Sequence, residues 1–143
     1  MSTASPTPRR VLFLCTHNSA RSQMAEGLLR SLGRGTFEVA SAGTMATRVR
    51  PEAIAVMREI GIDISTQTSK TLDRFLPECF DEVITVCDNA NETCPVFPGA
   101  RNRRHWSIDD PAGVQGPEAE RLAAFRGARD ALRQRIETEL LAE

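Results

Sequence analysis

The sequence lacks any long apolar run, and no stretch approaches the roughly 18–20 residues that a transmembrane helix needs. Its first residues, 1–8, are rich in Ser, Thr and Pro and lack the apolar segment of a signal peptide. We therefore expect a disordered tail over residues 1–8, no contact with a membrane, and a cytoplasmic location.

A large charge of either sign is also missing. The formal net charge of −1 gives no electrostatic case for binding nucleic acid or an anionic membrane. Cysteines are few, and in a reducing compartment four of them serve catalysis, redox chemistry or metal binding more often than structural disulfides.

The length and the apolar content indicate one domain. A chain of 143 residues with 41% hydrophobic composition can bury one full-size core but not two. We assign residues 9–143 to a single domain and expect it to be a monomer.

Strand-like and helix-like segments alternate along this domain. Short apolar runs predict strands over 11–14, 37–40, 82–86 and 104–108. Amphipathic spacing predicts helices over 19–32, 51–60, 72–80 and 118–141. This alternation predicts an α/β fold, a single three-layer domain with a four-stranded parallel sheet and helices on both faces.

The most informative segment runs from Cys15 to Ser22, directly after the first predicted strand. Backbone N–H groups of a loop that opens a helix converge on an anion, and the helix dipole favours the thiolate form of a cysteine there. The fork of Arg21 matches a tetrahedral oxyanion. The ordinary alternative is an inert Cys15 ending a strand and a surface Arg21. The strand, the turn-prone Asn18 and the helix start are in register, which favours an oxyanion-binding loop.

Cys87 follows another predicted strand, and in parallel sheets ligands bind beyond the carboxyl ends of the strands. Cys87 and Cys15 should therefore meet in one crevice. Cys94 lies seven residues after Cys87 across a polar, turn-prone segment. This suggests a relay of thiol–disulfide exchange, with two unrelated thiols as the alternative. A zinc site of Cys79, Cys87, Cys94 and His105 lacks the usual pairing of ligands, so we expect no metal site and treat Cys79 as a packing residue.

A carboxylate also follows the fourth predicted strand, in the segment 109–113. Asp110 beside an oxyanion site can protonate a leaving oxygen, although an Asp before a Pro is often only a turn residue. Ser22 can donate a hydrogen bond to the Cys15 thiolate, or it can simply cap the helix.

Taken together these motifs resemble a known family. The run from Cys15 to Gly27 is similar to the active-site loop of the low-molecular-weight tyrosine phosphatase superfamily. Within this superfamily, the chain resembles the thioredoxin-coupled arsenate reductases. The segments that carry this resemblance are Ser41-Ala42-Gly43, Val86-Cys87-Asp88-Asn89-Ala90, Cys94-Pro95 and His105-Trp106 with Asp109-Asp110-Pro111-Ala112-Gly113.

The resemblance implies reduction of arsenate to arsenite, with thioredoxin as electron donor and no bound cofactor. It implies that Cys15 is the nucleophile, Asp110 the general acid, and Cys87 and Cys94 the second and third redox thiols, which form a redox-active disulfide. It also implies that Arg21 and the loop amides hold the oxyanion. Those amides belong to Thr16, His17, Asn18, Ser19, Ala20, Arg21 and Ser22.

Two positions depart from the family pattern. Some members bind potassium through groups matching Asn18, Glu26, Ser41 and Thr68 with a further carboxylate, where this chain has Lys70. We expect the Lys70 ammonium to replace the cation and pair with Glu26. His17 stands where many relatives carry Gly, and we expect its side chain to face solvent.

Phosphate-monoester hydrolysis is the main rival function, because phosphate and arsenate are nearly isosteric. Tyrosine phosphatases of this kind usually carry aromatic residues after the Asp-Pro, whereas Ala112 and Gly113 follow here, and the chain has no Tyr. A non-catalytic oxyanion or redox sensor is the third hypothesis, and the complete set of nucleophile, acid and relay thiols argues against it.

Overall fold

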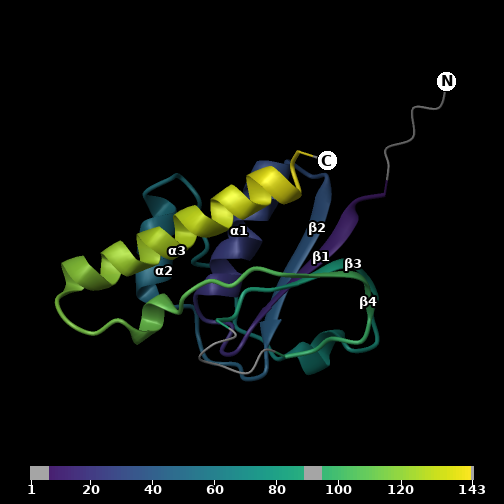
Figure 1. Ribbon diagram of the computed structural model, residues 1–143, viewed down its shortest axis with the longest axis horizontal. Helices are drawn as coiled ribbons and strands as arrows, with labels where there is room; N and C mark the ends of the chain where they lie inside the picture. The colour runs from purple at the N-terminus through teal and green to yellow at the C-terminus, as the bar shows by residue number, and fades with distance from the viewer. Residues whose placement is uncertain (1–6, 89–94, 143) are drawn as a thin grey trace.

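Four parallel strands form the centre of the molecule in the order β2-β1-β3-β4 (Figure 1). They are β1 (Arg9–Cys15), β2 (Phe37–Gly43), β3 (Phe80–Thr85) and β4 (Ala100–His105). The computed structural model describes residues 7–88 and 95–142. The predicted tail over residues 1–8 thus falls largely outside the described residues.

Strand β1 lies in the middle of the sheet and is buried on both faces. Val11, Phe13 and Cys15 face the larger core, while Leu12 and Leu14 face the smaller one. Alternate side chains of a strand point to opposite faces, so a strand covered on both sides must be apolar throughout. This is why a continuous apolar run, rather than an alternating pattern, marks β1 in the sequence.

The two faces of the sheet are covered unequally. The helices α1 (Arg21–Gly33), α2 (Pro51–Arg58) and α3 (Glu118–Glu139) share the larger core on one face. The other face is covered by the short 3-10 helix η1 (Leu72–Phe75) and by the ring of Phe97. The predicted α/β class with a four-stranded parallel sheet is therefore confirmed, and the helix of the second face is a single 3-10 turn.

Two predicted elements were misplaced. The helix expected over 72–80 ends at Phe75, because Pro77 lacks the N–H that would continue it, and Phe80 already opens β3. The ring of Phe80 packs edge-on against those of Phe75 and Phe97 at 5.9 and 5.7 Å between centroids.

The fourth strand covers 100–105 rather than 104–108. It is an edge strand whose sequence is mostly polar, so no apolar run marks it. Its Arg104 and Asn102 donate hydrogen bonds of 2.9 Å to the buried Glu82 on β3. Burial opposes ionisation of Glu82, but these bonds outweigh it and lower the pKa of this carboxyl.

Within residues 7–88 and 95–142, no helix has the length and apolarity that a bilayer crossing demands. The 3-10 helix η2 (Pro111–Gly113) follows β4, beyond the carboxyl end of the sheet, where the predicted site residues gather.

Candidate active site

The segment between β1 and α1 is a tight loop whose carbonyl groups are held from outside. They accept hydrogen bonds from Met45 N–H to Thr16 O (3.0 Å), from Thr47 Oγ1 to His17 O (3.2 Å) and from Arg50 N–H to Ser19 O (2.9 Å). A trans peptide holds its C=O and N–H antiparallel. Carbonyls that point outward therefore turn the following N–H groups to the inner side of the loop, which makes a cup for an anion.

Gly43, the last residue of β2, presses against this loop. A Cβ built on Gly43 would lie 2.6 Å from Thr16 O and 2.8 Å from Cys15 O. Only a residue without a side chain lets the two backbones approach so closely. Gly43 thus fixes the position of the loop from below.

Asn18 lies at the centre of the loop, fully buried and in the left-handed conformation with φ 49°. Its Oδ1 accepts the backbone N–H of Lys70 at 2.8 Å. That N–H can only donate, so it fixes the orientation of the amide. The Nδ2 group then donates in two directions, to Ser22 Oγ at 2.7 Å and to Ser41 Oγ at 3.0 Å.

This arrangement assigns the direction of the bond at the sulfur. Ser22 Oγ lies 2.8 Å from Cys15 Sγ and already accepts from Asn18. If the sulfur donated, the hydroxyl hydrogen of Ser22 would lose its acceptor in a buried site, which is costly. We infer that Ser22 donates to Sγ and stabilises the thiolate form of Cys15.

Helix α1 begins at Arg21, two residues later than predicted, because the loop occupies 16–20. The Arg21 side chain is 3% exposed, and its Nη1 donates to the carbonyl of Ile108 at 3.0 Å. Its Nη2 lies 3.7 Å from Asp110 Oδ2. Asp110 caps η2 by accepting the N–H of Ala112 at 3.0 Å, so it is a turn residue, and it also lies at the cleft beside Arg21.

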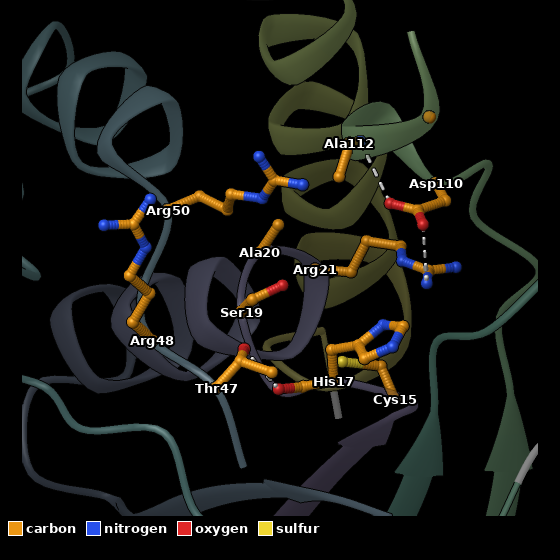
Figure 2. Close-up of a pocket in the computed structure, with 11 residues that line it drawn as sticks. Cys15, His17, Ser19, Ala20, Arg21, Thr47, Arg48, Arg50, Asp110 and Ala112 are labelled. Carbon is orange, nitrogen blue, oxygen red and sulfur yellow. Dashed lines mark hydrogen bonds and ion pairs between the residues drawn. The ribbon is translucent and has the colours of Figure 1, made fainter. Parts of the chain in front are cut away.

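A cleft of about 420 Å³ opens over the cup (Figure 2). The expected nucleophile Cys15 and the expected acid Asp110 both line it, and its rim comes from the segment before α2 and from η2. No Phe, Tyr or Trp is among the described residues that line it. They are Cys15, His17, Ser19, Ala20, Arg21, Thr47, Arg48, Arg50, Asp110, Ala112 and Gly113. The exposed side chain of His17 lies at the mouth, in agreement with the expectation that it faces solvent.

Cys87 approaches the same end of the sheet from β3. Leu14 pairs with Thr85 across the two strands, so Cys87 lies one residue beyond the level of Cys15. It is fully buried, with its Sγ 3.9 Å from the carbonyl oxygen of Leu14. The structure thus places two of the three predicted redox thiols at the carboxyl ends of neighbouring strands, although of these two only Cys15 is among the described residues that line the cleft. Cys94 lies outside the described residues.

Cys79 does not belong to this site. It precedes β3 and so stands at the opposite end of that strand from Cys87. It is also exposed, so the expectation of a packing role was wrong. Over the described ranges 7–88 and 95–142, no group of three or more His, Cys, Asp and Glu side chains is arranged to hold a metal ion.

Lys70 lies beside Glu26, as we expected from the resemblance to potassium-binding members of the family. Its Nζ is 3.9 Å from Glu26 Oε1 and donates to the carbonyl of Thr68 at 2.5 Å. Ser41 Oγ also donates to Glu26, at 2.5 Å. Burial lowers the pKa of Lys70, against the pull of Glu26. The expected pairing of Lys70 with Glu26 is therefore present.

Residues 10–143 match the model of the low molecular weight phosphotyrosine protein phosphatase family. The chain belongs to this family. Among members of the phosphatase family, an arsenate reductase of Halalkalibacterium halodurans is 47% identical over 128 residues, which cover 90% of this chain and 92% of the relative.

Solved structures agree with this placement in the phosphatase family. One of an arsenate reductase in the phosphate binding state has a TM-score of 0.80 and 37% identity, covering 94% of this chain and 98% of that one. A thioredoxin-dependent arsenate reductase of Corynebacterium glutamicum has a TM-score of 0.68 and 28% identity, covering 99% of this chain and 66% of that one.

Three residues of the site carried no predicted role. Gly43 was part of a recognised motif, but its close approach to the loop depends on the register of β1 and β2. Arg48 and Arg50 lie in a segment without regular structure, and only its hydrogen bonds to the loop bring them to the cleft. No sequence signal within that segment marks them.

Proposed function

We propose that this protein reduces arsenate to arsenite, with Cys15 as nucleophile and thioredoxin as the source of electrons. The observation that carries the proposal is the buried Cys15 sulfur, which accepts from Ser22 inside a cup of inward N–H groups closed by Arg21. An anionic nucleophile and an anionic substrate repel each other, and the N–H groups with the guanidinium offset this repulsion.

In the first step the Cys15 thiolate attacks arsenic(V), and an S–As bond forms as an As–O bond breaks. Asp110 in its acid form supplies the proton with which the departing oxygen leaves as water. The contact with Arg21 and the N–H of Ala112 hold this carboxyl at the rim of the cleft, facing the cup. Arg21 also stabilises the equatorial oxygens of the transition state.

In the second step the thiolate of Cys87 attacks the sulfur of Cys15. The S–As bond breaks, its electron pair stays on arsenic, and arsenite leaves with arsenic(III). The two sulfurs have supplied two electrons and are joined as a disulfide. Cys94 then attacks Cys87, which frees Cys15 and moves the disulfide to Cys87–Cys94, and the dithiol of thioredoxin reduces that bond.

The named relatives support this reading, since the arsenate reductase of Halalkalibacterium halodurans matches nearly the whole chain and the Corynebacterium glutamicum enzyme is thioredoxin-dependent. A thioredoxin partner requires a reducing compartment, so we place the protein in the cytoplasm.

A coupled assay tests the proposal. The purified chain with thioredoxin, thioredoxin reductase and NADPH should oxidise NADPH only when arsenate is present, and one arsenite should appear for each NADPH. Cys15→Ser should abolish this rate, because among the described residues Cys15 is the one cysteine that lines the cleft. Arsenate-independent oxidation, or wild-type turnover in Cys15→Ser, would end the proposal.

Hydrolysis of phosphate monoesters is the second candidate, because the cup matches any tetrahedral oxyanion and a similar reductase binds phosphate. Among the described residues, the rim offers a phosphotyrosine ring no Phe, Tyr or Trp to stack on, and Ala112 and Gly113 stand beside the expected acid. We therefore expect p-nitrophenyl phosphate to be hydrolysed far more slowly than arsenate is reduced. The reverse order of rates would make the protein a phosphatase.

A further inference from the structure

Two arginines line the cleft without a part in the proposed reduction. Arg48 and Arg50 lie between β2 and α2, and both face the cavity that contains Cys15. Arg50 extends over Ala20 toward Ala112 on the opposite rim (Figure 2). Across residues 7–88 and 95–142, neither guanidinium has an ion pair or a hydrogen bond, whereas Arg21 in the same cleft has both.

The backbone that carries these arginines is fixed to the oxyanion loop. Arg50 N–H donates to Ser19 O at 2.9 Å, and Thr47 Oγ1 donates to His17 O at 3.2 Å. Thr47 N–H donates in turn to Ser69 Oγ at 2.8 Å. The backbone is therefore anchored on both sides of Arg48, so the two arginines extend from a fixed segment at the edge of the cleft.

The charge of the cleft is unbalanced. Arg21 lies within ion-pair distance of Asp110, so the uncompensated positive charge comes from Arg48 and Arg50. The whole chain carries a formal charge of −1, which means that this positive field is local to the cleft. Like charges on one rim repel, and an anion between them removes that repulsion. Guanidinium forks match the oxygens of a tetrahedral anion.

We propose that Arg48 and Arg50 form an outer oxyanion subsite, which captures the arsenate dianion at the mouth of the cleft and delivers it to the cup at Cys15. This inference rests on the proposed function for the identity of the substrate. The subsite recognises charge and tetrahedral shape, so inorganic phosphate occupies it as well. Because the arginines act before the chemical step, they affect capture of arsenate and not the later steps of the relay.

The double variant Arg48→Gln/Arg50→Gln tests the subsite in the coupled assay. At low ionic strength we expect kcat/KM for arsenate to fall about tenfold, through a higher KM with kcat nearly unchanged. The deficit should vanish in about 1 M salt, where the Debye length is about 3 Å. Arg58→Gln is the control for removal of an arginine charge elsewhere, since it removes one positive charge from an exposed residue at the end of α2, outside the cleft, where the double variant removes two.

A second measurement does not depend on arsenate reduction. The rates at which iodoacetate and iodoacetamide alkylate Cys15, followed by mass spectrometry, compare an anionic with a neutral reagent at one sulfur. The ratio of the two rates should fall about tenfold in the double variant and stay constant in Arg58→Gln. Inorganic phosphate should protect Cys15 less well in the double variant.

Wild-type kcat/KM together with a wild-type alkylation ratio in the double variant would overturn the subsite. A wild-type protein that fails to reduce arsenate, while the alkylation ratio still depends on the two arginines, would overturn the proposed function and leave the anion subsite supported.

Discussion

Removing the hydroxyl of Ser22 tests whether the buried network sets the reactivity of Cys15. Ser22 Oγ lies 2.8 Å from Cys15 Sγ and accepts from Asn18 Nδ2 at 2.7 Å. The substitution Ser22→Ala therefore deletes one donor to the sulfur and leaves one N–H of Asn18 without its acceptor. Ser22 and Asn18 are both fully buried, so bulk water does not replace the lost group.

The two losses have different consequences. A hydrogen bond to a charged group contributes about 1.5–3 kcal/mol, and this part acts on the thiolate alone. At 1.4 kcal/mol for each factor of ten, it corresponds to a roughly ten- to hundredfold lower thiolate population near neutral pH. An unsatisfied buried donor costs about 1–3 kcal/mol, and this part lowers the free energy of unfolding.

Alkylation of Cys15 by iodoacetamide at pH 7 measures the first loss, because this neutral reagent is insensitive to the charges of the cleft. Urea unfolding measures the second. We expect Ser22→Ala to slow alkylation about ten- to hundredfold. The control is Ser31→Ala, an exposed serine on the same helix, which should change neither quantity.

The alkylation rate of Cys15 and the free energy of unfolding together show whether Ser22 donates to the sulfur. If Ser22→Ala is alkylated within twofold of the wild-type rate while its unfolding free energy falls, then Ser22 braces the loop but donates nothing to the thiolate. The inferred direction of the bond to the sulfur would then be wrong.

Three further predictions follow from the site and the relay. Cys94→Ser should release about one arsenite per protein and then stop, since two earlier thiols supply both electrons; sustained turnover with thioredoxin would refute the order of the relay. Potassium should change activity and Tm little relative to sodium at equal ionic strength, because Arg30 and Lys70 already place positive charge at Glu26, whereas Lys70→Asp should create a potassium response; strong stabilisation of the wild type by potassium contradicts this. Gly43→Ala should cost about 1–3 kcal/mol of stability and most of the activity, because its Cβ would lie 2.6 Å from Thr16 O; a fully active variant in a thermal and kinetic comparison would show that the loop can move.

Sequence patterns predicted the parts of this fold that depend on local burial. The apolar run 11–14 predicted β1, and the residues from Cys15 to Arg21 predicted a loop that opens a helix, because a strand, a turn and a helix start are each encoded locally. Strand β4 was misplaced because its partners are charged. Its Arg104 is held by Glu82 on the neighbouring strand, and such a pairing leaves no periodic apolar signal.

Two residues at the rim of the cleft were also missed, because no local sequence pattern marks them. Arg48 and Arg50 reach the site only because carbonyls of the oxyanion loop accept from the segment 44–50. Each of these bonds joins residues about thirty positions apart, which no local window contains. The rim of the cleft, and with it the charge that an approaching anion meets, is therefore a property of the tertiary structure.

One buried hydrogen-bond network joins Glu26, which lies beside Lys70, to the sulfur of Cys15. Asn18 Nδ2 donates toward Ser22 and toward Ser41, and each hydroxyl passes its own hydrogen on, to the sulfur of Cys15 and to the carboxylate of Glu26. The amide of Asn18 thus donates to two hydroxyls, and these donate to the sulfur of Cys15 and to the carboxylate of Glu26. The sulfur and the carboxylate must both accept for every hydrogen of the network to have a partner. The carboxylate of Glu26 pairs with Arg30 at 2.5 Å and lies 3.9 Å from Lys70, and it accepts from Ser41, so the Ser41 hydroxyl donates away from the amide. The amide then remains free to hold Ser22 in the orientation that favours the thiolate. A cation placed well away from the cleft therefore supports the reactivity of Cys15 without touching the substrate.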